Sequence, residues 1–132
     1  MKTEKYINDE GEFRAFGFPN TFVGKALLKE ALETLPGLKI RSFEKAWGVE
    51  TFCEFTFKGI EFSVSEPYGD NSYYDIFCNE PNTKELEQLL EFISSSEFSD
   101  RLLYKNLSRL ARLIAATGLI LLGVLAFNLL NW

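Results

Sequence analysis

The residues that could do chemistry in this 132-residue chain gather in one short segment, from Glu66 to Asp75. The side chains there that could contact a partner are Glu66, Tyr68, Asp70, Asn71, Tyr73, Tyr74 and Asp75. Their oxygen atoms suit a hard cation, but the spacing is not that of an EF-hand loop, and Gly, Asp and Asn are also ordinary turn residues. Because tyrosine is enriched at protein interfaces, we expect a turn that contacts a protein partner, and no metal site.

Enzymatic chemistry has little support in the composition. The chain contains no histidine, so neither a Cys–His pair nor a Ser–His–Asp triad can form. Cys53 alternates with Phe55 and Phe57, which is typical of a small buried residue rather than a nucleophile. The glycines match no phosphate-binding loop, and the nineteen acidic residues single out no catalytic pair. We therefore expect no enzyme activity and no cofactor.

The C-terminal segment 113–132 contains no charged residue. At about 1.5 Å of helical rise per residue it spans roughly 30 Å, the thickness of the hydrocarbon core of a bilayer. A buried helix of a soluble fold would also be apolar all round, but the rest of the chain is too short to wrap it and still form its own core. We expect a single-pass transmembrane anchor that places Trp132 at the far headgroup region.

Basic residues precede this anchor, and we expect them to lie at the membrane surface: Arg101, Lys105, Arg109 and Arg112. Residues 1–100 hold ten basic and nineteen acidic residues, whereas residues 101–132 hold four basic residues and no acid. Since basic residues beside a span stay on the cytoplasmic side, we expect a tail-anchored protein with its N-terminal domain in the cytoplasm, at the inner membrane if the source is bacterial. The four side chains share one helical face, which either lies on the headgroups or is an ordinary solvated face.

Two helices are predicted in the first 100 residues, which contain twelve of the thirteen phenylalanines and suffice for one small domain. The first is capped by Asn20 or Thr21 and ends at about Leu35. Its apolar stripe consists of Phe22, Leu28, Ala31, Leu32 and Leu35. The second starts after Pro81, with Asn82 or Thr83 as its cap, and ends near residues 94–96.

Between these helices apolar residues recur at every second position, which indicates antiparallel strands. One strand is predicted to place on a single face Val49, Thr51, Cys53, Phe55 and Phe57. The turn at Lys58-Gly59 leads to a second strand, residues 73–78 supply a third, and residues 39–45 a fourth. The predicted fold is α+β: a two-layer domain with a three- or four-stranded meander bracketed by two amphipathic helices.

The expected organisation is a soluble acidic domain (1–97), a hinge and basic amphipathic juxtamembrane helix (98–112), and the transmembrane anchor (113–132). The most flexible part should be residues 94–100. Small residues in the span permit self-association, for which the support is weak because no G-x-x-x-G occurs. Nothing near the N-terminus resembles an export signal, so Cys53 and Cys78 should be reduced thiols.

The charge of the domain, −9 over residues 1–100, argues against nucleic acid as a partner. We expect a non-enzymatic, membrane-anchored protein whose acidic domain binds another protein, one version being the neutralisation of a basic toxin or effector, as immunity proteins do. The alternative is a small subunit or assembly factor of a membrane complex that acts through its transmembrane helix.

Overall fold

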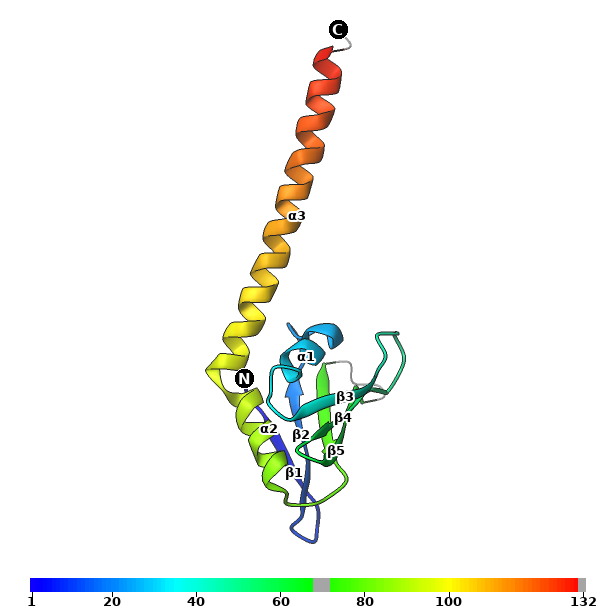
Figure 1. Cartoon of the computed structure of the whole chain (residues 1–132), viewed down its shortest axis with the longest axis vertical. Helices are drawn as coiled ribbons and strands as arrows, with labels where there is room; N and C mark the ends of the chain where they lie inside the picture. The colour runs from blue at the N-terminus through cyan, green and yellow to red at the C-terminus, as the bar shows by residue number, and fades with distance from the viewer. Residues whose placement is uncertain (68–71, 131–132) are drawn as a thin grey trace.

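The computed structural model describes residues 1–67 and 72–130, with side chains up to Phe127, and shows an α+β domain from which one long helix rises (Figure 1). Six strands form one antiparallel sheet in the order β1-β2-β6-β5-β4-β3. In chain order the elements are β1 (Glu4–Ile7), β2 (Phe13–Pro19), α1 (Lys25–Leu32), β3 (Leu38–Phe43), β4 (Thr51–Phe57), β5 (Ile60–Ser65), β6 (Tyr73–Cys78), α2 (Lys84–Ser94) and α3 (Ser96–Leu130).

The sheet has more strands than the three or four predicted, because β1 and β2 form an N-terminal hairpin that pairs with β6. In this hairpin Ile7 lies opposite Phe13 and Tyr6 lies opposite Ala15, so Arg14 is an extra residue on β2. Such a bulge shifts the alternation of side chains by one position. Phe13 and Phe16 are therefore both buried although they are three positions apart, and the period of two that marks a strand is lost from the sequence.

A second irregularity lies in β4, where Thr51 pairs with Ser65 but Cys53 pairs with Val64. The extra residue is Phe52, and both Phe52 and Cys53 are buried. Thr51 is exposed, so the prediction that it shares a face with Cys53 is wrong. The bulge places two consecutive core side chains on the same layer.

The predicted bracketing of the sheet by two helices also differs from the structure, since α1 lies between β2 and β3 and three helices contribute to the core. α1 is shorter than predicted: its N-cap is Gly24, and Phe22, expected in the apolar stripe, is 76% exposed. α2 agrees with its prediction, because Thr83 caps it by accepting a hydrogen bond from the Leu86 amide (3.2 Å).

One layer of buried side chains joins the helices to a single face of the sheet. The aromatic members of this core are Phe13, Phe16, Phe18, Phe52, Phe55, Phe57, Phe62, Tyr74 and Phe98. The strand positions that alternate with them point to the other side, where side chains such as Glu54, Ser63 and Phe77 are exposed or half-buried. We call this side the open face, because none of the described helices covers it.

α3 belongs to both parts of the molecule. Ser95 alone separates it from α2, accepting a hydrogen bond from the Phe98 amide (3.2 Å) and donating one to the Phe92 carbonyl (2.6 Å). Within the segment expected to be a hinge, Phe98 is fully buried, and Leu102 beyond it is 4% exposed. Every side chain from Arg109 to Phe127 is exposed, and α3 contains an 18-residue window of mean hydropathy 2.2 with no buried residue. α3 is thus long and apolar enough to cross a membrane.

Candidate functional site

The residues predicted to contact a partner do not form one cluster. Tyr68, Asp70 and Asn71 lie outside the described residues. The Glu66 carboxylate lies 3.3 Å from the Lys25 ammonium, and both side chains are largely buried. Asn20 donates a further hydrogen bond to Glu66 (3.4 Å), so this carboxylate ties the end of β5 to the loop and helix above it.

Tyr74 is part of the core. Its ring lies 5.0 Å from that of Phe52 and 6.0 Å from that of Phe18, and its side chain is 4% exposed. Burial, and secondarily the negative charge of Glu66, raises the pKa of Tyr74 to about 12. A side chain in this position stabilises the domain and is not available to a partner.

Tyr73 and Asp75 point to the open face, where the sheet brings them beside residues from the N-terminal hairpin. The Tyr6 hydroxyl donates a hydrogen bond to the Asp75 carboxylate (3.0 Å), and the contact passes over Gly17. Partial burial and then the hydrogen bond to Asp75 raise the pKa of Tyr6 to about 12. Tyr73 lines a shallow pocket with the N-terminal residues Lys2, Thr3 and Glu4.

Two aromatic residues of this surface, Tyr6 and Phe77, were not among the contact residues predicted from the sequence. They are 38% and 40% exposed, and both lie in one row across the sheet, since Tyr6 pairs with Ala15 and Ala15 with Phe77. A signal for Phe77 was present: it alternates with Ile76 and Cys78, so a large apolar side chain falls on the side that the strand pattern leaves to solvent. Tyr6 had no such signal, because its strand was not recognised.

The open face is acidic as well as aromatic. Carboxylates on it come from Glu4, Glu54, Glu61 and Asp75, which the strand pairing places across four strands. Arg41 forms an ion pair with Glu61. Aromatic rings among carboxylates suit contact with a basic protein surface.

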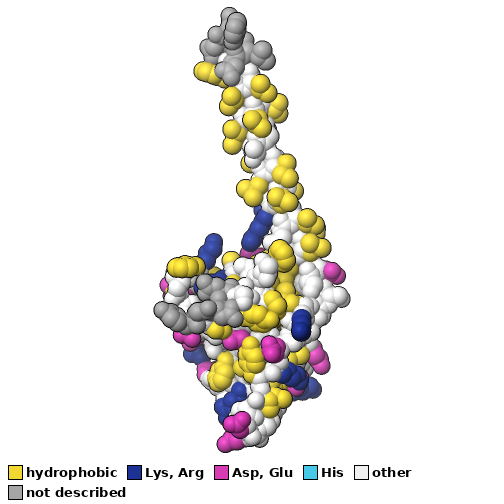
Figure 2. Space-filling view, turned by 180° about the vertical axis from the view of Figure 1, so that it is seen from behind, with side chains coloured by type: hydrophobic (Ala, Val, Ile, Leu, Met, Phe, Trp, Pro, Cys, Tyr) yellow, Lys and Arg dark blue, Asp and Glu magenta, His cyan; other side chains and the backbone are white. Residues whose placement is uncertain are grey.

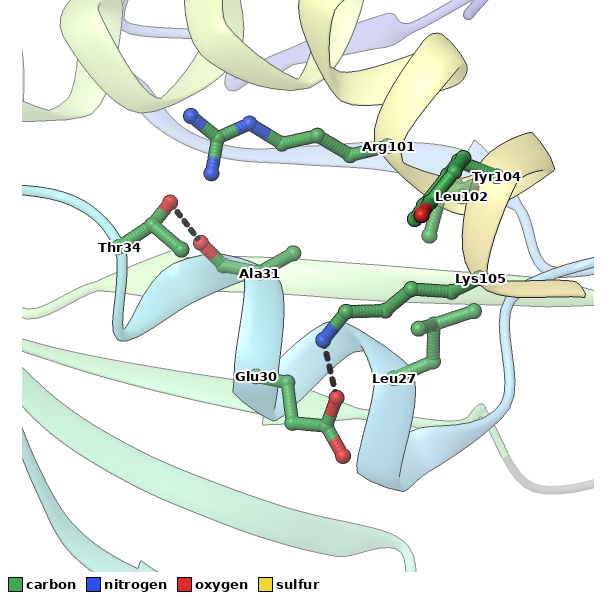
Figure 3. Close-up of a pocket in the computed structure, with 8 residues that line it drawn as sticks. All are labelled: Leu27, Glu30, Ala31, Thr34, Arg101, Leu102, Tyr104 and Lys105. Atoms are coloured by element: carbon green, nitrogen blue, oxygen red, sulfur yellow. Dashed lines mark hydrogen bonds and ion pairs between the residues drawn. The ribbon is translucent and has the colours of Figure 1, made fainter. Parts of the chain in front are cut away.

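The basic residues before the span divide into two pairs. Lys105 forms an ion pair with Glu30 and lowers the pKa of that carboxyl, and Arg101 contacts Glu97 at 2.6 Å. Arg101, Lys105 and Glu30, together with apolar side chains of α1 and α3, line a small pocket of about 100 Å³ (Figure 3). Arg109 and Arg112 are exposed further along α3, and Trp132 lies outside the described residues.

Within residues 1–67 and 72–130, no three His, Cys, Asp or Glu side chains lie close enough to hold a metal ion. Cys53 and Cys78 are buried free thiols on strands separated by β5, and burial raises the pKa of Cys53 to about 11. A high pKa leaves little thiolate at neutral pH, so Cys53 is a poor nucleophile.

The fold and its surfaces define an acidic α+β domain joined without a linker to a helix that is able to span a membrane. A scan against protein-family models finds no match for this chain. Searches of curated proteins and of solved structures find no match either.

Proposed function

We propose that this protein is a non-enzymatic, single-pass membrane protein whose acidic domain binds a basic protein partner through the open face of its sheet. The observation that carries the proposal is the arrangement of Tyr6, Asp75 and Phe77 on a sheet face that no described helix covers. Aromatic side chains lose little conformational entropy when an interface immobilises them. Where they lie among carboxylates, they favour binding of a positively charged surface.

The membrane part of the proposal is supported by α3. Within the described residues its apolar segment has no buried side chain, and a soluble core helix of that composition would be buried. The basic residues at its start favour an orientation with the domain in the cytoplasm. Figure 2 shows basic side chains where α3 leaves the domain and hydrophobic side chains above them.

The class of partner follows from charge. Nineteen acidic residues against ten basic ones in residues 1–100 attract a cationic protein across about 8 Å at physiological salt. A basic toxin or effector that reaches the inner face of the membrane is the specific form of partner that we propose.

Site-specific photo-cross-linking in membranes tests the open face. A photo-reactive residue replaces Phe77 in the full chain, and a second chain carries it at Glu91 on the exposed side of α2. We expect a discrete protein adduct from position 77 alone. Glu54→Lys, on the open face, should reduce that adduct several-fold, while Glu91→Lys, with the same change of net charge, should not. Equal reduction by both substitutions would show bulk charge attraction and contradict a defined site.

A second function, a subunit that acts through its span, is favoured by the unburied segment of α3 and by its small residues Ala115, Gly118, Gly123 and Ala126. A chain that ends at Arg112 retains every described core residue and separates the two functions. Partner binding that survives this truncation assigns recognition to the domain. Binding that is lost assigns it to the span.

A further inference from the structure

Two large aromatic side chains lie exposed in the loops at the end of the domain from which α3 leaves. Phe22, between β2 and α1, is 76% exposed, and Trp47, between β3 and β4, is 89% exposed. Figure 1 shows α1 and the β3–β4 loop at this end of the domain, with the β1–β2 turn at the opposite end. Nothing in the domain core uses these two rings.

Residues of α3 that lie near each loop give the position of both loops along that helix. The Asn106 amide donates a hydrogen bond to the Phe22 carbonyl (3.1 Å), and Arg109 lines the same pocket as Trp47. With about 1.5 Å of rise per residue, Asn106 lies roughly 10 Å and Arg109 roughly 6 Å before Leu113, where the uncharged segment begins. The headgroup layer on each side of a bilayer is about 5–8 Å thick, so both rings lie at or near its depth.

The cations at this level are suited to lipid phosphates. Lys45 lines the pocket with Trp47 and Arg109, and neither Lys45 nor Arg109 has an acidic partner within 4.0 Å among the described residues. Of the carboxylates in this region, Glu30 and Glu66 are paired with Lys105 and Lys25, whereas Glu44 and Glu50 of the β3–β4 loop have no cation within 4.0 Å among the described residues. Charges near the lipid decide this contact, because interactions beyond about 8 Å are largely screened at physiological salt.

We propose that Phe22 and Trp47 enter the headgroup layer of an anionic phospholipid bilayer, and that Lys45 and Arg109 bind lipid phosphates beside them. This inference rests on the proposed membrane anchoring by α3. Exposed aromatic rings with an apolar body and, in tryptophan, a polar N–H are the side chains that favour this layer. The docked domain stands upright on the membrane in a fixed orientation, with the β1–β2 turn pointing away from it.

Tryptophan fluorescence of the full chain tests the docking. Trp132→Phe leaves Trp47 as the single tryptophan, and the protein is reconstituted into vesicles of phosphatidylcholine with or without phosphatidylglycerol. We expect Trp47 to be quenched by a headgroup spin-labelled lipid and shielded from aqueous iodide, more so with phosphatidylglycerol. Lys45→Gln combined with Arg109→Gln should abolish the effect of phosphatidylglycerol.

A matched chain carries Trp47→Phe, Trp132→Phe and Ile7→Trp, which moves the reporter to the end of β1, far from α3, where Ile7 is 60% exposed. Its iodide quenching constant should be several-fold higher than that of Trp47.

Flotation of the vesicles tests the membrane anchor separately from the docking of the domain. A chain that floats while Trp47 matches the Ile7→Trp control overturns the docking and leaves the anchor intact. Shielding from iodide without quenching by the labelled lipid also overturns it, since another protein copy then covers Trp47. A chain that does not float overturns both.

Discussion

The identity of Gly17 is set by contacts with residues far away in the sequence. A Cβ atom at this position would lie 2.2 Å from the Tyr6 hydroxyl oxygen and 2.6 Å from an Asp75 carboxylate oxygen. The Tyr6 side chain crosses the glycine to reach Asp75, an arrangement that compensates for a strand residue without a side chain. Glycine at this position therefore leaves room for the hydrogen bond between Tyr6 and Asp75 on the open face.

Gly17→Ala should have opposite effects on stability in two backgrounds. In the parent chain it displaces Tyr6 and Asp75 and should lower the free energy of unfolding. In a background that carries both Tyr6→Ala and Asp75→Ala the clashing atoms are absent, and Ala should stabilise the domain by about 0.4–1 kcal/mol because it restricts the unfolded chain. Urea unfolding of the four chains in detergent, monitored by circular dichroism, gives the change in the free energy of unfolding in each background. The same sign in both backgrounds would contradict the role given to Tyr6.

Tyr74 should make the domain sensitive to alkaline pH. Burial raises its pKa from 10.0 to about 12, so the folded state holds the phenol proton more tightly than the unfolded state does. The resulting stability is complete below pH 10 and is lost as the pH rises through about 12. The free energy of unfolding of the Tyr74→Phe chain should therefore fall less than that of the parent between pH 10 and 12. Denaturant titration at each pH measures this difference. Tyr104→Phe, at a residue 76% exposed, is the control and should follow the parent curve.

Among the elements, α3 has two environments along its length. Its first turns complete the domain core, with the Phe98 ring 5.4 Å from Phe92 and 6.4 Å from Phe18. The ion pair of Lys105 with Glu30 follows along α3, and an exposed pair of this kind contributes only about 0.2–1 kcal/mol. The start of α3 is therefore bound to the domain mainly by buried apolar contact, which makes the junction stiff.

Phe98→Ala should destabilise the domain strongly in a chain that ends at Arg112. Removing a fully buried phenylalanine costs about 3–5 kcal/mol, because transfer energy is lost and a cavity remains. Leu107→Ala, on the same helix but 55% exposed, should cost less than about 0.5 kcal/mol. Urea unfolding compares them. Similar small losses for both substitutions would show that α3 starts as a loose stalk.

At the scale of the whole molecule, the chain separates polar and apolar surface along one axis. The domain carries the acidic groups and the open face at one end, and α3 carries an uncharged segment at the other (Figures 1 and 2). A soluble protein would bury such a segment in an oligomer interface, and a membrane protein would place it in lipid. Alkaline washing separates the two cases, because it releases a soluble oligomer and leaves a helix that spans the bilayer in the membrane.

Leu122→Arg should weaken membrane retention of the full chain. Arginine at the centre of a span costs about 2.5–3.5 kcal/mol, so the fraction released by alkaline carbonate should rise. Leu110→Arg, before the uncharged segment, adds the same charge near the interface and should leave retention unchanged. An N-terminal tag protected from protease in right-side-out vesicles places the domain in the cytoplasm. A parent chain released entirely by carbonate would refute the anchor.

The sequence determined the local features of this protein. A run of uncharged residues from Leu113 onward, Thr83 followed by an apolar stripe, and the alternation around Lys58-Gly59 each depend on neighbours within a few residues. Helical and strand periodicities are local, so they predicted the long apolar helix, α2 and the β4–β5 hairpin. The same logic failed wherever one inserted residue, Arg14 or Phe52, shifted the period.

Only the tertiary structure decided which surfaces exist. Pairing of β2 with β6 places Tyr6 beside Asp75 and sends Tyr74 into the core, although Tyr74 and Asp75 are consecutive and were predicted together. The packing of the domain on α3 likewise brings the Phe22 carbonyl to Asn106 and places Trp47 in one pocket with Arg109. These contacts join residues tens of positions apart, and long-range pairing is chosen by the burial of the whole core, which no short window of sequence contains.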